Sequence, residues 1–178
     1  MSKRSFLYYD VWDAPIGTMT LVANKDGVCR IDFGTFKELS SHHNIWARKH
    51  FLAPEFIHDA DYDYIKQMKE QLSEYFQGER TSFSVKLNCY GTPFQRKVWR
   101  ILANDISYGE TLSYKDIAVL LQSPKAIRAV GGAVNKNPLS IVIPCHRVIG
   151  SNGKLVGYAG GLDRKQQLIE LEAPDKAI

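Results

Sequence analysis

The chain has 178 residues, of which 44% are hydrophobic and 24% charged, a composition typical of a globular protein with one domain or two small ones. The apolar run at residues 6–9 is too short for a signal peptide, and no stretch is long enough to cross a membrane. The three cysteines, Cys29, Cys89 and Cys145, show no paired spacing, which argues against a disulfide framework and predicts a reducing cytoplasm.

Charge is distributed unevenly along the chain. Residues 1–91 contain 11 basic and 12 acidic residues, whereas residues 92–178 contain 12 basic and 7 acidic ones. The basic second half favours an anionic partner, most simply nucleic acid.

The first third of the chain has the pattern of β-structure. Runs rich in Val, Ile, Thr and aromatic residues predict strands at residues 6–11, 18–23 and 28–33, with a turn at 24–27 joining the last two into a hairpin. We expect residues 34–59 to be irregular. The four histidines of this stretch fit no standard metal-ligand spacing, so we predict exposed side chains and no metal for His42, His43, His50 and His58.

Apolar positions at helical spacing predict a helix over residues 61–77 that Gly78 ends, and alternation predicts a strand over 83–87. Both the charge balance and the pattern change near residues 88–91. The sequence therefore predicts an α/β (α+β) protein, with an N-terminal β-sheet domain and flanking helix at residues 1–88 and a mostly helical domain at 89–178.

The second domain begins with a clear helix start. Thr92 as N-cap, Pro93 at the first helical position and Gln95 completing a capping box predict a helix that ends near Asn104. The residues expected to form its buried stripe are Phe94, Val98, Ile101 and Leu102.

A turn at residues 108–110 precedes a second short helix, which Ser113 and Asp116 cap. Its expected inner face consists of Ile117, Leu120 and Leu121. Residues 123–124 start a third helix over 125–134, and the two short helices have the dimensions of a helix-turn-helix.

The third helix has an unusual surface, because Arg128 stands among small residues, namely Ala126, Ala129, Gly131, Gly132 and Ala133. A helix that reads the major groove normally offers polar side chains to base edges. Small residues allow either a close approach to a shallow groove or tight packing against neighbouring helices, and the pattern leaves both readings open.

Residues 141–143 are three apolar residues that predict a buried strand, and Pro144 then steers the chain into a turn. Cys145, His146 and Arg147 follow. A Cys beside cation-capable residues loses its proton easily, and the thiolate is a nucleophile, although a buried structural Cys is the common alternative.

The last helix is predicted over residues 163–172. Glu172 lies three and four residues beyond Ile169 and Leu168 and shares their apolar face. A partly buried carboxylate needs a partner, for which His146 is a candidate, although a solvated Glu172 stays open.

Together these segments resemble the O6-alkylguanine-DNA alkyltransferases of the bacterial branch. The resemblance covers nearly the whole chain and is most specific at 144–148 (PCHRV). The supporting blocks stand in the family's order: 74–78 (EYFQG), 91–95 (GTPFQ), 109–110 (GE), 113–114 (SY), 128–133 (RAVGGA), 137–138 (NP) and 158–161 (YAGG). It implies a ribonuclease-H-like first domain and a second domain that binds DNA.

The resemblance also implies a reaction, the irreversible transfer of an alkyl group from O6 of guanine in DNA to Cys145. His146 would deprotonate the thiol through a water, and Glu172 would orient the imidazole. Tyr114 would donate a proton to N3 of the departing guanine, and Asn137 would hold the turn and bind near the thiol.

DNA contacts follow from the same resemblance. Arg128 would fill the gap left by a flipped base, and small residues would let the helix approach the minor groove. The implied DNA and base contacts are Ala126, Ala129, Gly132, Val148, Ser151, Tyr158 and Ala159. Position 159 departs from relatives that carry Ser there, which predicts a different tolerance of bulky alkyl groups. We expect no cofactor, no metal, a monomer, and O4-alkylthymine as a second substrate.

Three other functions are compatible with parts of the pattern. A lesion-binding relative without transfer would lack the acceptor thiol, which Cys145 supplies. A helix-turn-helix regulator would need a polar recognition helix. A cysteine hydrolase using Cys145 and His146 would need an oxyanion hole, and adjacent residues rarely face each other as a dyad.

Overall fold

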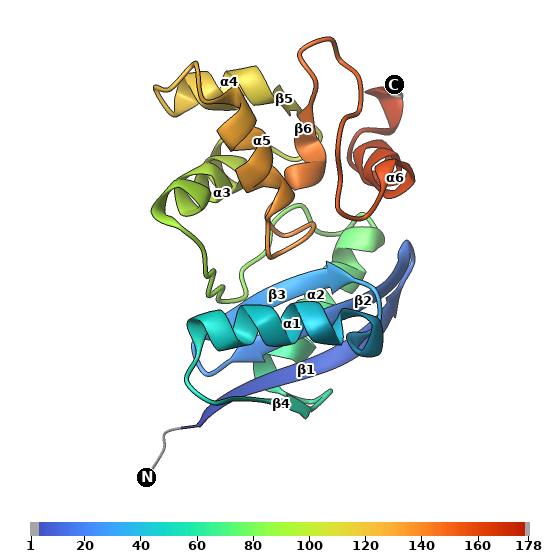
Figure 1. Ribbon diagram of the computed structural model, residues 1–178. Helices are drawn as coiled ribbons and strands as arrows, with labels where there is room; N and C mark the ends of the chain where they lie inside the picture. The colour runs from blue at the N-terminus through green and yellow to red at the C-terminus, as the bar shows by residue number, and fades with distance from the viewer. Residues whose placement is uncertain (1–3, 177–178) are drawn as a thin grey trace. The chain divides into compact units, whose positions relative to one another are not determined.

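The computed structural model describes residues 4–176, and the chain divides after Tyr90 into two compact units (Figure 1). The first unit contains a four-stranded sheet and two helices, and the second contains four α-helices and a short pair of strands. The predicted combination of a sheet-bearing N-terminal part with a helical C-terminal part is confirmed.

The sheet of the first unit has the order β3-β2-β1-β4. Its strands are β1 (Ser5–Ala14), β2 (Gly17–Asn24), β3 (Gly27–Phe33) and β4 (Pro54–His58). Strand β2 pairs antiparallel with both β1 and β3, whereas β4 pairs parallel with β1. The three predicted strands and the hairpin are therefore confirmed.

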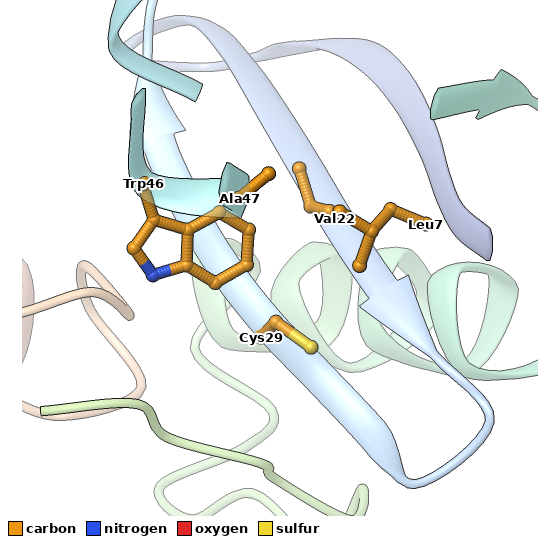
Figure 2. Packing of buried hydrophobic residues seen from close by; sticks show 5 residues of the cluster. All are labelled: Leu7, Val22, Cys29, Trp46 and Ala47. Carbon is orange, nitrogen blue, oxygen red and sulfur yellow. The ribbon is translucent and has the colours of Figure 1, made fainter. Parts of the chain in front are cut away.

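Two helices, α1 (Phe36–His50) and α2 (Asp63–Phe76), lie on opposite faces of this sheet (Figure 1). On the α1 face, Trp46 and Ala47 pack with the strand residues Leu7, Val22 and Cys29 in one buried cluster (Figure 2). Helix α2, which the pattern at residues 61–77 predicted, buries the apolar stripe Ile65, Met68, Leu72 and Tyr75.

The prediction of an irregular segment at residues 34–59 is wrong, because α1 and β4 lie within it. A capping box between Thr35 and Glu38 starts α1, and the basic side chains of its last turn interact favourably with the helix dipole. The prediction of exposed histidines is wrong for His43, which is fully buried and bonds Asp32 through Nε2 at 2.9 Å. His42 and His58 are exposed, and His50 is half-buried.

The prediction of a strand at residues 83–87 is also wrong. In this segment an isolated β-bridge pairs Leu87 with Val28. The Val28 N–H donates to the Lys86 carbonyl, and the Val28 carbonyl accepts from the Asn88 N–H. The close approach explains the glycine at the start of β3: a Cβ on Gly27 (φ +142°) would lie 2.5 Å from the Lys86 carbonyl oxygen.

The second unit begins with α3 (Pro93–Asp105), followed by β5 (Leu112–Ser113), α4 (Tyr114–Leu120) and α5 (Ile127–Asn135). It continues with the 3-10 turn η1 (Cys145–Arg147), β6 (Val148–Ile149), α6 (Leu162–Glu172) and the short η2 (Pro174–Lys176). Both predicted capping boxes are present, at Thr92 with Gln95 and at Ser113 with Asp116.

The two short helices of the predicted helix-turn-helix are present, with two differences in detail. Helix α5 begins at Ile127 and not at residue 125, and its N-cap Ala126 makes no side-chain hydrogen bond. Leu120 is exposed rather than inward, and Ala118 takes its place beside Ile117. Trp99 is buried and donates from Nε1 to the Ala133 carbonyl at 2.8 Å, which ties α3 to α5.

The strand predicted at residues 141–143 is a turn. Ile141 has a φ of +73°, an uncommon conformation for a β-branched residue. The turn closes through hydrogen bonds from the Ile143 N–H to the Leu139 carbonyl and from the Val142 N–H to the Ser140 carbonyl. Ile141 and Ile143 are buried in the second unit. Burial requires apolar residues here, and this explains why the composition resembles that of a strand. Across residues 4–176, no helix is long and apolar enough to span a bilayer.

Candidate active site

Cys145 is the first residue of η1, directly after the turn, and is 6% exposed. The preceding Pro144 has no N–H and sits at the entry to η1, while the parallel pairing of β6 with β5 fixes the chain after η1. The thiol is therefore held between two backbone constraints rather than on a regular element.

Asn137 organises the turn and the thiol together. Its Nδ2 donates to the Ile143 carbonyl at 2.7 Å and lies 3.0 Å from the Cys145 sulfur, while its Oδ1 accepts from the Leu139 N–H at 2.9 Å. Because one side chain contacts both, the geometry of the turn sets the position of the sulfur.

Burial raises the pKa of the Cys145 thiol above its ordinary value. The hydrogen bond from Asn137 and the positive charge of Lys165 act in the opposite direction and offset part of that rise. The resting group is therefore a thiol, and a base must take its proton before it attacks.

His146 is completely buried, and its Nε2 lies 2.7 Å from Glu172 Oε1. Because a carboxylate only accepts, this bond places the imidazole proton on Nε2 and leaves Nδ1 as the basic nitrogen. Arg147 donates two hydrogen bonds to the same carboxylate, from Nε to Oε2 at 2.8 Å and from Nη2 to Oε1 at 3.0 Å. The Arg147 Nη1 donates to the Ile106 carbonyl at 2.7 Å.

The charge state of this cluster follows from its contacts. Burial opposes ionisation of Glu172, but hydrogen bonds and charges from His146 and Arg147 outweigh it and lower its pKa to about 2. For His146, burial lowers the pKa, Glu172 raises it, and the charges of Arg147 and Lys165 lower it further. The result is an ionised carboxylate beside a neutral imidazole.

A pocket of about 580 Å³ opens beside the thiol, a volume within the range of small-molecule sites. Its lining comes from α4, α5, the turn and the loop after β6, and consists of Tyr114, Lys115, Ile127, Gly131, Gly132, Val134, Asn135, Asn137, Ser140, Cys145, Gly150, Ser151, Val156, Gly157, Tyr158 and Ala159. Most of this lining is apolar, so a planar base could enter with little loss of hydrogen bonds.

The structure brings together most of the predicted site residues. Seven of them line the pocket, namely Tyr114, Gly132, Asn137, Cys145, Ser151, Tyr158 and Ala159. His146 and Glu172 lie buried outside the lining, and Val148 is fully buried in β6. Arg128 and Ala129 are exposed on α5, with Ala126 at its N-cap, so these three mark a surface rather than the pocket.

Sequence reasoning missed two buried cations of the site. Arg147 was noticed only as a neighbour of the thiol, yet its fork on Glu172 fixes the carboxylate. Lys165 was overlooked although it lies three, four and seven positions before Leu168, Ile169 and Glu172, on the one buried face of α6. A charged residue inside an apolar stripe was the signal that could have found it.

The structure offers no metal centre in the part of the chain that it describes, since no three His, Cys, Asp or Glu side chains gather there in a way that could hold an ion. All three cysteines are unpaired thiols.

Comparison with known proteins identifies the class to which this fold and thiol site belong. Residues 7–89 match the family described as 6-O-methylguanine DNA methyltransferase, ribonuclease-like domain, and residues 93–174 match the DNA-binding domain of the same protein. A methylated-DNA–protein-cysteine methyltransferase of Methanosarcina barkeri is 44% identical over 93% of this chain and 97% of its own length. A constitutive one from Bacillus subtilis is 41% identical over 86% and 87%.

Solved structures agree. An O6-methylguanine methyltransferase of Mycobacterium tuberculosis superposes with a TM-score of 0.75 at 39% identity, covering 94% of this chain and 93% of its own. A complex of the M. tuberculosis protein with DNA gives a TM-score of 0.77. The chain belongs to the O6-alkylguanine-DNA alkyltransferase family, and its second unit carries the family's DNA-binding domain.

Proposed function

We propose that this protein performs direct-reversal DNA repair, by moving the alkyl group of O6-alkylguanine in duplex DNA onto its own Cys145. The observation that carries the proposal is the Cys145 thiol in a largely apolar pocket, contacted by Asn137 and followed by a buried His–Glu pair, in a chain of this family. In the reaction the alkyl carbon leaves O6, a C–S bond forms, and guanine departs with the electron pair of the broken bond. The resulting thioether is stable, so each molecule acts once.

Activation of the thiol is assigned to His146 and Glu172. Since burial keeps Cys145 protonated, the free Nδ1 of a neutral His146 takes the proton through one water, and the ionised Glu172 stabilises the imidazolium that forms. The Asn137 amide, 3.0 Å from the sulfur, stabilises the thiolate.

Tyr114 is assigned to the leaving group. Its hydroxyl donates to the Val156 carbonyl at 3.1 Å, so it faces the pocket and can exchange this partner for N3 of guanine. A proton delivered there neutralises the charge that develops on the purine. Tyr158 and Ala159 form part of the pocket wall, and backbone groups around Cys145, Val148 and Ala159, with Ser151 at the rim, read the base.

A stacked base cannot reach a thiol inside a pocket, so the nucleotide has to be flipped, at a cost of a few kcal/mol. The exposed Arg128 fills the vacated space in the stack, and the small residues Ala126, Ala129 and Gly132 allow approach from the minor groove. A Cβ at Gly132 would meet no atom within 4 Å, so this surface is open. Phosphate contacts from the basic second half make binding sensitive to salt.

The remaining assignments complete the proposal. O4-alkylthymine is a second substrate, the protein acts as a monomer without cofactor or metal, and three unpaired thiols suit a reducing cytoplasm. Residues 1–88 form a ribonuclease-H-like domain, and residues 89–178 form the DNA-binding and transfer domain with its helix-turn-helix.

Intact mass measured after mixing the protein with a short duplex carrying one O6-methylguanine tests this function. We expect a stoichiometric gain of one methylene mass in the native protein and in Cys89→Ser, a matched control at another thiol, and no gain in Cys145→Ser. Lesion-selective binding without a mass gain would reassign the protein as a lesion binder. Neither gain nor binding would refute the repair function.

A further inference from the structure

Lys165 is a lysine of α6 with a fully buried side chain. Lysines are almost never fully buried unless they are paired. Within the described residues, its ammonium makes its hydrogen bonds to backbone carbonyls, to Val156 at 2.9 Å and Gly157 at 3.2 Å, and to no carboxylate. Burying a positive charge that is held only by backbone dipoles costs free energy. Its presence here therefore points to a role beyond packing.

The two carbonyls that Lys165 holds belong to the pocket. Val156 and Gly157 both line it, and the Val156 oxygen also accepts the hydrogen bond from Tyr114. The Gly157 backbone has a φ of +50°, a left-handed conformation that glycine adopts without strain. Lys165 therefore ties this wall to α6, whose last residue is the buried Glu172. When Tyr114 turns to a bound base, the ammonium still satisfies the Val156 carbonyl.

Lys165 also acts through its charge. Burial lowers the pKa of Lys165 to about 8, and the charge on Cys145 acts against that decrease. Conversely, burial raises the pKa of Cys145, while the Asn137 hydrogen bond and then the Lys165 charge lower it. Among the charged groups of this region, Lys115 also lines the pocket, and Glu172 is paired with Arg147 and hydrogen-bonded by the neutral His146. Of these groups, Lys165 is the cation whose charge lowers the pKa of the Cys145 thiol and so favours the thiolate.

We propose that Lys165 is a positioning residue for alkyl transfer, which holds the Val156–Gly157 wall of the pocket and stabilises the Cys145 thiolate by its charge. This inference rests on the transfer function proposed above. It assigns two effects to one ammonium group: a hydrogen-bonding effect on the wall and an electrostatic effect on the sulfur.

Two neutral variants separate these effects. Lys165→Met removes both the charge and the hydrogen bonds at similar length, whereas Lys165→Gln removes the charge and keeps a donor. Lys154→Met removes an exposed lysine of the same loop and serves as the matched control. Three quantities are measured: the single-turnover methyl-transfer rate at saturating lesion DNA, the Kd for that DNA, and the apparent pKa of Cys145. The last comes from its iodoacetamide alkylation against pH, followed by peptide mass spectrometry.

We expect both Lys165 variants to raise the apparent pKa of the Cys145 thiol and to slow transfer about tenfold at neutral pH, with Met slower than Gln. The Kd should change less than twofold, and Lys154→Met should match the native protein. A thiol pKa and a transfer rate equal to those of the native protein in both variants would overturn the inference. A loss of thermal stability alone, with an unchanged thiol, would leave Lys165 a structural residue and also overturn it.

A second measurement does not depend on Lys165 variants that fold. The ammonium of Lys165 is titrated by NMR on lysine-labelled native protein and on Cys145→Ser. Over the pH range in which the Cys145 thiol ionises, reciprocity requires that the thiolate holds the Lys165 proton, so Cys145→Ser should lose that proton at a lower pH. An identical titration in both proteins contradicts the inference. The mass gain of native protein on O6-methylguanine DNA tests the repair function separately, so failure of one can be told from failure of the other.

Discussion

The two units contain the same buried trio of residue types, a carboxylate held by an arginine fork and by a histidine Nε2. In the first unit Asp32 accepts from Arg30 at 2.8 and 2.7 Å and from His43 at 2.9 Å. In the second, Glu172 accepts from Arg147 at 2.8 and 3.0 Å and from His146 at 2.7 Å. In both clusters the histidine Nδ1 is buried and makes no hydrogen bond within residues 4–176.

Their surroundings differ. His43 packs against the rings of Phe36 and Phe56, and Arg30 lies over the ring of Trp46. The thiol beside this cluster, Cys29, donates to the Gly27 carbonyl, and burial raises its pKa to about 12. The thiol beside the second cluster, Cys145, receives a hydrogen bond from Asn137 and lines a pocket.

The comparison shows that a His–carboxylate–Arg trio is by itself a way to bury three polar residues together. In the proposed function, what distinguishes the second cluster is that a substrate can reach the adjacent thiol through the pocket. Pairs of matched substitutions in the two clusters test this distinction, because each pair changes the same contact in both units.

The largest expected effect is on the transfer rate. His146→Gln keeps a donor to Glu172 but removes the basic nitrogen, and we expect a loss of about 10²- to 10⁴-fold in single-turnover transfer. His43→Gln makes the matched change at Asp32 and should leave the rate within about twofold, because no thiol in a pocket depends on His43. The rates are read from the mass of the protein after rapid quenching. A slow His43→Gln protein would break the comparison.

The next effect is on stability and should be equal in the two units. Glu172→Ala and Asp32→Ala each leave a buried arginine without its carboxylate, which costs about 3–5 kcal/mol. Hydrogen exchange followed by mass spectrometry reports each unit separately. We expect protection to fall at residues 91–176 for Glu172→Ala and at residues 4–90 for Asp32→Ala. Unchanged protection in either variant would show that its cluster is not holding that unit together.

Acid should destabilise the second unit in two steps. Because the neutral His146 has a lowered pKa in the fold, the unfolded chain binds its proton first, and stability begins to fall below about pH 6.5. The pKa of Glu172 is about 2 in the folded protein, against the ordinary value of 4.5 in the unfolded chain. Its contribution to the free energy of unfolding, about 3 kcal/mol at most, is therefore present above pH 4.5 and is lost between pH 4.5 and pH 2. Urea unfolding against pH measures this, and Glu172→Gln should remove the lower step.

The smallest effects come from the helix caps. Thr35→Ala in the first unit and Ser113→Ala in the second each remove a capping box, and each should cost about 1 kcal/mol. Ser113 directly precedes Tyr114, so only its replacement should also slow transfer, by a few fold. Thermal unfolding and transfer rates of the two variants check this. Equal transfer rates in both would mean that the cap does not position the tyrosine.

Much of the fold could be predicted because local rules decide it. The strands at residues 6–33 and the caps at Thr92 and Ser113 depend on residues a few positions apart. Helix α1 was missed although its Thr35–Glu38 box follows the same rule, because only His43, Trp46 and Ala47 of its 15 residues are buried and they leave little apolar periodicity. The strand predicted at residues 83–87 failed because alternation alone does not supply a partner along the whole segment.

The sequence by itself determined the hairpin strands, the capped helices of the second unit and the basic second half, and it placed Cys145 and His146 side by side. Only the tertiary structure decided that Ile141 lies in a turn, that His43 and Lys165 are buried, and that Asn137 reaches the Cys145 sulfur. The physical reason is distance along the chain. Caps and strands are fixed by neighbours, whereas the pocket and its charges arise where α4, α5, α6 and the loop after β6 meet, and no local pattern encodes that meeting.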